Sequence, residues 1–312
     1  MNPAINDVVA AFGQISVHPT SMVIDGTGVD FPSGGHFQGI QRLPTAPELL
    51  VITSDSDTQA YFVACKMAED GLSARAYSPV TMAMSPLKHA GGCQAFGNYL
   101  VAGVEDNDSN QASEVQFWDF TRFPMQLIPM TIPRSGGVNV STAGAVGLSS
   151  FEKGTALAVA TFNAETIDFY VSDADPFGGS PLNFRYTWVK ADADKTGWID
   201  QNFGAYQSVN LITQTDGQLF MVGTHRAGDY DFMDLYRVHL GVVPTLTKLA
   251  KKHMICTNGC NFNAGAGIFI PSSAGFEVYA VPYNPVVVQE PELLVPEPNW
   301  PTTIQVNHFT AP

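Results

Sequence analysis

The sequence has few charged residues, and basic residues are the scarcest. Of its 312 residues only 14% are charged, and 29 Asp and Glu outnumber 15 Lys and Arg, for a formal net charge of -14. This shortage of positive charge excludes a nucleic-acid-binding protein that relies on a basic surface. Low charge combined with 45% apolar residues also excludes disorder, because disordered chains combine high charge with low hydrophobicity. The composition therefore predicts a compact acidic globule.

Long apolar runs and cysteines are scarce as well. No run reaches the roughly 18 apolar residues of a membrane-spanning helix, so we expect no membrane span. Four cysteines are too few for a disulfide scaffold, although Cys256 and Cys260 are spaced to close a small loop if the compartment is oxidising. The chain starts without the basic and apolar regions of a signal peptide. Low charge and many small polar residues nevertheless suit an extracellular or periplasmic protein, which is the location we expect.

An internal repeat organises the chain. The segments His36–Gln41 and His89–Gln94 align without gaps as His-x-x-Gly-x-Gln, and three weaker copies begin at Thr142, Asn202 and Asn261. By subtraction, the first positions are 53, 53, 60 and 59 residues apart. Five copies at nearly constant spacing indicate a repeated structural unit.

Each copy is followed by strand-like runs rich in β-branched and aromatic residues. Residues 49–53, 60–64 and 74–82 are the three runs after the first copy, and similar runs follow the next three copies. Four strands per repeat of about 50 to 60 residues resemble the blade of a β-propeller. The sequence therefore predicts an all-β, five-bladed β-propeller of four-stranded blades that forms a single domain over residues 1–312.

The two ends of the chain complete this interpretation. The last repeat has only one further strand after its Pro-rich stretch, at residues 303–309, while an unassigned strand at residues 14–24 precedes the first repeat. We expect these two strands to pair, so that the N-terminal strand completes the last blade and closes the ring, which removes free sheet edges. Only residues 6–12 have a helical pattern.

The repeat also predicts a ring of polar side chains at one end of the central channel. The first motif position is polar in every copy: His36, His89, Thr142, Asn202 and Asn261. The sixth position adds three amides: Gln41, Gln94 and Gln207. These side chains either tie the blades together through hydrogen bonds or bind a small ligand at the channel mouth. Two histidines without a third histidine or a nearby carboxylate make a poor zinc site, so the motif alone does not indicate metal catalysis.

Acidic stretches are the candidates for cation binding and for catalysis. One of them resembles the start of an EF-hand calcium loop through Asp192, Asp194 and Asp200, but Phe203 stands where such a loop has a bidentate glutamate. Calcium is the one cofactor that the sequence suggests, and the alternative is a turn before the fourth inner strand. Other acidic steps, such as residues 54–57 and 105–108, are typical of solvated turns. Asp30 and Asp200 are the carboxylates predicted nearest the channel rim.

Three functions fit these observations. The first is a non-enzymatic binding module, secreted or surface-exposed, that holds a small ligand such as a carbohydrate at the channel mouth or between blades. The second is a glycan-acting hydrolase with Asp30 and Asp200 as acid and base. The third is a protein-interaction scaffold that uses exposed loops, such as the Pro-rich residues 282–301. The repeat resembles a propeller in architecture only and matches no family of known activity.

Overall fold

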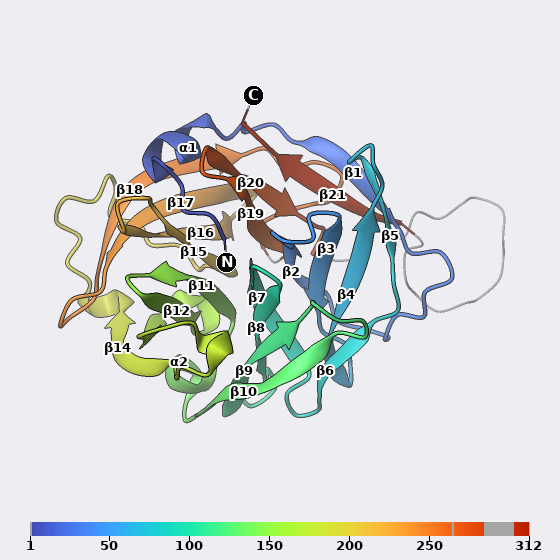
Figure 1. The fold of residues 1–312 in the computed structure, drawn as a ribbon, viewed down its shortest axis with the longest axis horizontal. Helices are drawn as coiled ribbons and strands as arrows, with labels where there is room; N and C mark the ends of the chain where they lie inside the picture. Colours follow the sequence, from blue (N-terminus) through green and yellow to red (C-terminus); the bar gives the residue numbers. More distant parts are fainter. Residues whose placement is uncertain (1, 264, 284–302, 312) are drawn as a thin grey trace.

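The fold is built almost entirely of β-strands. The computed structural model describes residues 2–263, 265–283 and 303–311. Its strands form three hydrogen-bonded sheets that curl around a common centre into a nearly closed arrangement (Figure 1). Among the residues that the structure describes, helical structure is confined to α1 (Val8–Gln14), α2 (Val138–Ser141) and three short 3-10 turns. Within the described residues, no helix has both the length and the apolar character to span a bilayer.

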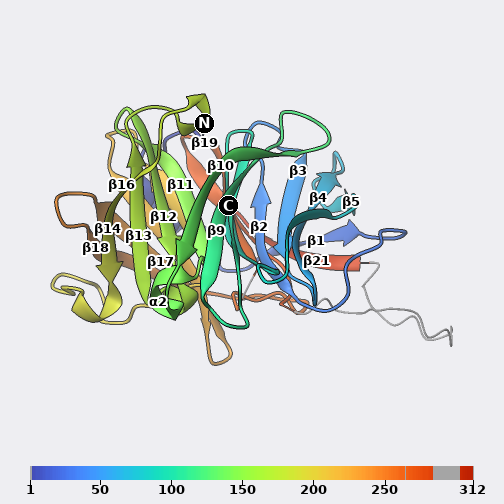
Figure 2. The same ribbon diagram turned by 90° about the horizontal axis from the view of Figure 1, so that it is seen from below.

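Most strands belong to antiparallel groups that follow one another along the chain. The first group is β2 (Phe37–Arg42), β3 (Leu49–Ser54) and β4 (Gln59–Met67), with β5 (Ser73–Ala76) and β6 (Val80–Met84) both paired to β4. The second is β7 (His89–Phe96), β8 (Tyr99–Glu105), β9 (Ala112–Asp119) and β10 (Gln126–Ser135). The third is β11 (Ala145–Phe151), β12 (Gly154–Ala160), β13 (Thr166–Ser172) and β14 (Asn183–Val189). The fourth is β15 (Ser208–Thr213), β16 (Leu219–Ala227), β17 (Tyr230–His239) and β18 (Thr245–Met254). The groups stand side by side around the molecule, with β2 to β4 opposite β11 to β13 in the view of Figure 2.

The last group combines the two ends of the chain. It consists of β19 (Ala266–Ser272), β20 (Gly275–Ala280), β21 (Thr303–Phe309) and β1 (Thr20–Asp25). β1 pairs antiparallel with β21, and Thr20 lies opposite His308. β1 also pairs in parallel with β5, which joins the last group to the first.

The N-terminal strand is shorter than the sequence pattern predicts. Residue 14 ends helix α1 instead of starting a strand, and β1 begins only at Thr20. Asp7 precedes the helix as its N-cap, and its side chain accepts a hydrogen bond from the backbone of Ala10 at 2.9 Å. Val8 and Phe12 are buried against the core that includes β20. The helix thus includes Gln14, and residues 15–19 connect it to β1 without regular secondary structure.

The first strands of the groups meet in the middle of the molecule. β2 contacts β7, β7 contacts β11, β11 contacts β15, and β19 contacts both β15 and β2. Their close approach requires small residues: a Cβ on Gly92 would lie 2.4 Å from the carbonyl oxygen of Gln207. β11 pairs in parallel with β7 through Ala145 and Gly92, the fourth positions of their motif copies. The small residues at the fourth motif position thus allow these strands to approach closely.

Candidate functional site

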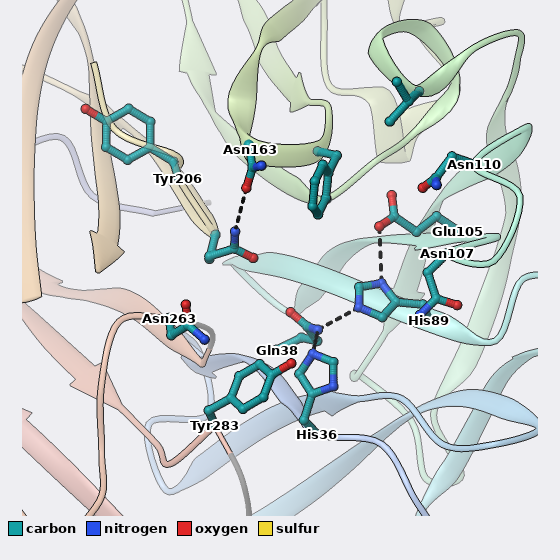
Figure 3. Close-up of a pocket in the computed structure, with 14 residues that line it drawn as sticks. His36, Gln38, His89, Glu105, Asn107, Asn110, Asn163, Tyr206, Asn263 and Tyr283 are labelled. Atoms are coloured by element: carbon teal, nitrogen blue, oxygen red, sulfur yellow. Dashed lines mark hydrogen bonds and ion pairs between the residues drawn. The ribbon is translucent and has the colours of Figure 1, made fainter. Parts of the chain in front are cut away.

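A cavity of about 460 Å³ opens at one end of this central region (Figure 3). Its walls come from segments at the ends of several inner strands, so residues far apart in sequence face one another. Polar side chains dominate its lining: His36, Gln38, His89, Glu105, Asn107, Asn110, Asn163, Gln207 and Asn263. Phe162, Tyr206 and Tyr283 supply aromatic surface. The arrangement combines hydrogen-bonding groups with aromatic faces around one space.

Two histidines of the motif lie together on one wall of this cavity. His36 directly precedes β2, His89 is the first residue of β7, and their ring centroids are 5.5 Å apart. The amide nitrogen of Gln38 hydrogen-bonds to Nε2 of His36 and lies 2.6 Å from Nε2 of His89. An amide nitrogen can only donate, so both Nε2 atoms act as acceptors and the ring protons belong on Nδ1. The two imidazole lone pairs therefore converge on a single position.

Each histidine has a buried carboxylate behind it. Oδ1 of Asp55 lies 3.1 Å from Nδ1 of His36, and Oε1 of Glu105 lies 3.2 Å from Nδ1 of His89. Both carboxylates are held by backbone groups: Asp55 accepts from the N–H of His36 at 2.5 Å, and Glu105 accepts from the N–H of Ala143 at 2.7 Å. Asp55 is 5% exposed and Glu105 is 2% exposed. The carboxylates thus fix both ring orientations.

The loop before β2 is shaped to wrap around Asp55. Gly34 and Gly35 both have φ of +76°, a backbone conformation that side chains with a Cβ rarely adopt. A Cβ on Gly35 would lie 2.2 Å from the carbonyl oxygen of Asp55. The glycine pair therefore lets the chain turn tightly over the carboxylate and deliver His36 to the cavity.

The two histidines respond differently to this environment. Burial lowers the pKa of His36 to about 4, even though the charge of Asp55 acts in the opposite direction. Burial also acts to lower the pKa of His89, but the hydrogen bond and charge of Glu105 outweigh it and the pKa is raised. The pair therefore combines one neutral imidazole with one that holds a proton more readily, within a single polar wall.

The other first positions of the motif lie outside the cavity lining. Thr142 is fully buried and donates its hydroxyl to the carbonyl of Val138 at 2.6 Å. Asn202 is exposed and its N–H donates to Asp200, while the side chain of Asn261 accepts from the N–H of Asn263. Of the five first positions, His36 and His89 are the ones that line the cavity.

Two glutamines of the motif have a structural role, and the third lines the cavity. Gln41 is fully buried and donates to the carbonyl of Cys93 at 2.8 Å, and Gln94 donates to the carbonyl of Leu211 at 2.8 Å. These two side chains therefore tie inner strands together. Gln207 lines the cavity and donates to Asn163 at 3.4 Å.

The fourth copy of the motif lies in a loop, because β15 begins only at Ser208. A residue that the motif does not include, Asn210, makes the corresponding bonds between strands. Its amide donates to the carbonyl of Cys93 at 3.2 Å and accepts from the N–H of Ile268 at 3.2 Å.

The predicted catalytic carboxylates do not line the cavity. Asp30 is an exposed residue between β1 and β2. Oδ1 of Asp200 lies 3.0 Å from Nζ of Lys248, a fully buried residue that also lies 3.1 Å from Oδ2 of the buried Asp234. The ion pair with Lys248 is among the causes that hold the pKa of Asp200 below its ordinary value, although burial acts to raise it. Asp200 is thus part of a charge network under β17 and β18.

The carboxylates of the calcium-like loop are also separated. Asp192 ends a 3-10 turn (Lys190–Asp192), and Asp194 accepts a hydrogen bond from the N–H of Thr196 at 2.9 Å, the geometry of a polar turn. In the part of the chain that the structure describes, these residues form no cluster of three groups able to hold a metal ion. The cluster that does meet this condition is His36, Asp55 and His89.

Three residues that contact the two histidines are not at the motif positions proposed as ligands: Gln38, Asp55 and Glu105. Asp55 and Glu105 belong to the acidic steps that the sequence analysis interprets as solvated turns, yet both are buried. The strand register explains their position, because Glu105 lies directly opposite His89 across the β7–β8 hairpin. Asp55 follows Ser54, which is opposite Phe37 in the β2–β3 hairpin. A carboxylate at the same place in two repeats, next to a histidine, is the pattern to look for.

Comparisons with known proteins give only distant similarities of fold. No protein-family model matches the chain, and no curated protein is similar enough in sequence to match it. A protein from Lactobacillus plantarum aligns with a TM-score of 0.38 and 12% identity. This alignment covers 78% of this chain and 63% of that protein. The PQQ-bound aldose sugar dehydrogenase of Streptomyces coelicolor aligns with a TM-score of 0.40 and 12% identity, covering 91% of this chain and 82% of that one. A putative hydrolase from Bacteroides ovatus aligns with a TM-score of 0.41 and 8% identity, covering 89% and 87%. At these scores, the similarities give no conclusion about function.

Proposed function

We propose that the chain is a five-bladed β-propeller that binds a small polar ligand, a carbohydrate, in the cavity at its channel mouth. Support for the architecture comes from the inner strands, since β2, β7, β11, β15 and β19 contact one another in cyclic order. Further support comes from β1, which supplies the fourth strand of the last group through its pairing with β21. In this proposal β1 closes the ring, and the cavity is the open end of the channel.

The cavity is the observation on which the binding proposal depends. Its volume of about 460 Å³ is within the roughly 300–1,000 Å³ typical of small-molecule sites. Side-chain amides and imidazoles offer both donors and acceptors, as a ligand with many hydroxyl groups requires. The ring of Tyr283 lies beside that of His36, with centroids 4.2 Å apart and ring planes tilted by 34°, and presents an aromatic surface of the kind that suits the apolar face of a sugar ring.

The hydrolase alternative has less support from this geometry. A glycosidase needs two carboxylates on either side of one bond. Neither Asp30 nor Asp200 lines the cavity, and Asp200 is paired with Lys248. Glu105 does line it, but this carboxylate is already engaged by His89 and by the N–H of Ala143. We therefore propose binding without turnover.

The remaining alternatives stay predictions. Most of the Pro-rich segment proposed for a scaffold, residues 284–302, lies outside the described residues. An extracellular or periplasmic location and a bound calcium ion have no further support in the site described above.

The experiment is a screen of immobilised glycans, followed by calorimetric titration of the best ligand into the full chain. Tyr283→Ala removes the aromatic surface of the cavity, and we expect it to weaken binding by roughly tenfold or more. Tyr230→Ala is the matched control, because Tyr230 is 58% exposed and lies outside the cavity. We expect the control to bind as the wild type does.

Three results would contradict the proposal. The first is that no glycan of a broad set binds to the chain. The second is that Tyr283→Ala and Tyr230→Ala bind the ligand with equal affinity. The third is release of shortened glycan by the wild type but not by Glu105→Gln, which would show a hydrolase. Recovery of intact glycan supports a binding module.

A further inference from the structure

We propose that His36, His89 and Asp55 form a binding site for one divalent transition-metal ion of the zinc class. The motif gives two histidines but no carboxylate, and the structure supplies the missing one from the end of β3. One ligand atom from each side chain lies within 4.8 Å of the others. Bonds of about 2.0–2.2 Å place two ligand atoms of a tetrahedral ion roughly 3.4 Å apart. Side-chain rotations that bring the ligand atoms closer by about an ångström would therefore close the site.

The position of Gln38 marks where the ion would sit. Its amide nitrogen hydrogen-bonds to Nε2 of both histidines, and only 3% of the surface of Gln38 is exposed. A donor N–H group and a metal ion both interact with the free lone pair of an imidazole nitrogen. Both Nε2 atoms thus face one point, and in its neutral form each imidazole offers a lone pair there. In the metal-bound form the ion replaces the amide group, which rotates toward the cavity.

The groups behind the histidines are those of a metal site. Metal-binding histidines usually donate their second N–H to a carboxylate or carbonyl, which fixes the ring and raises its basicity. Glu105 has this place relative to Nδ1 of His89, and a backbone N–H holds Glu105 in turn. Asp55 contacts Nδ1 of His36 through Oδ1, and its Oδ2 lies 4.0 Å from Nε2 of His89.

The charge balance points to a dication. Among the described residues, the ion-pair partners of Asp55 and Glu105 are these two histidines alone. Both carboxylates are nearly buried, and burial of a charge that is not fully compensated is costly. A divalent cation at the converging Nε2 atoms balances that charge. Since His36, Gln38 and His89 line the cavity, the ion would have an open coordination position facing it.

Zinc binding to the full chain tests this inference without any sugar. Cys256 and Cys260 are both replaced by serine, because these thiols are the competing zinc ligands. The chain is stripped with a chelator and titrated calorimetrically with Zn²⁺, Ca²⁺ and Mg²⁺. We expect one equivalent of Zn²⁺ to bind in the micromolar range or tighter and to raise the unfolding temperature, while Ca²⁺ and Mg²⁺ do neither, since imidazole ligands favour zinc over these hard ions. Co²⁺ should give the intense visible bands of a tetrahedral site.

Variants then separate the roles of the side chains. Glu105→Gln should weaken zinc binding roughly 10- to 100-fold, the usual cost of losing a partner behind a histidine ligand, and His89→Ala should weaken it more. His253→Ala is the control, because this histidine is exposed and remote from the cavity lining, and should bind zinc as the parent does. Gln38→Ala removes the group that competes with the ion and should bind zinc at least as tightly as the parent.

Some outcomes would overturn the inference. One is the absence of saturable zinc binding to the parent that lacks Cys256 and Cys260, a measurement that does not depend on whether any site variant folds. Others are a preference for Ca²⁺ over Zn²⁺, unchanged affinity in His89→Ala, or loss of binding in Gln38→Ala. Because sugar is absent throughout, failure here leaves the carbohydrate proposal standing, and failure of the glycan screen leaves the metal site standing.

Discussion

Replacement of Gln94 by leucine tests how much the buried amides of the inner strands contribute to stability. The side chain is 1% exposed and makes three hydrogen bonds of 2.8 Å, to the N–H of Leu148 and to both the N–H and the carbonyl of Leu211. Leucine has a similar size but can make none of these bonds, so three buried backbone groups lose their partner. At about 1 kcal/mol of net stability for each bond, the loss is about 3 kcal/mol, and larger if the orphaned groups find no water.

This loss is measurable by urea unfolding and by thermal unfolding. For a chain of 312 residues, about 3 kcal/mol corresponds to a fall in unfolding temperature of roughly 5 °C. Gln111→Leu is the matched control, because Gln111 is exposed and its amide donates only to the carbonyl of Ser109. We expect the control to change stability by less than about 0.5 kcal/mol. Equal effects of the two substitutions would refute the view that Gln94 holds the inner strands together.

Two further predictions concern strand packing and pH. Gly92→Ala should destabilise the protein by about 1–3 kcal/mol in urea unfolding, because its Cβ would meet a carbonyl oxygen of the neighbouring strand at 2.4 Å. Gly13→Ala, in a helix with open space around the new Cβ, should instead be neutral or stabilising by up to about 1 kcal/mol, and the same sign for both variants would contradict this. Burial acts to raise the pKa of Glu277, but the hydrogen bond from His308 and other partners outweigh it, so the folded pKa is lowered. The wild type should therefore be more stable than Glu277→Gln above about pH 4.3, and this advantage should vanish as the pH falls through the lowered pKa. Urea unfolding of both proteins between pH 7 and 3 measures the difference. A difference in stability that does not depend on pH would contradict this prediction.

Much of the strand pattern could be predicted from the sequence, because each sheet group repeats the same alternation. The run predicted at 49–53 is observed as Leu49–Ser54, and the run at 60–64 as Gln59–Met67. The run predicted at 74–82 is instead two strands, Ser73–Ala76 and Val80–Met84. Pro79 lies between them and has no N–H for a sheet hydrogen bond, which explains the break.

The site was harder to predict than the strands, because a gap-free motif aligns residue types and not strand register. Asn210 makes the bonds between strands that the alignment assigns to Gln207, and no repeat in the sequence shows a shift of this kind. Burial of Asp55 and Glu105 was also hidden, since an Asp-rich step after a strand has the same sequence whether it faces water or a histidine. Register and burial depend on contacts between groups far apart in the chain, which local patterns do not report.

The pairing of β1 with β21 has a consequence for how the protein is made. Thr20 and the carbonyl of His308, which share a hydrogen bond, are 288 residues apart in sequence. At roughly 5–20 residues per second, a ribosome needs about 15–60 s to synthesise the chain between them. During this interval the N-terminal strand has β5 as a partner on one edge only, while its other edge is free to pair with a neighbouring nascent chain. A pause or truncation before residue 303 would therefore favour aggregation between chains on the same messenger RNA.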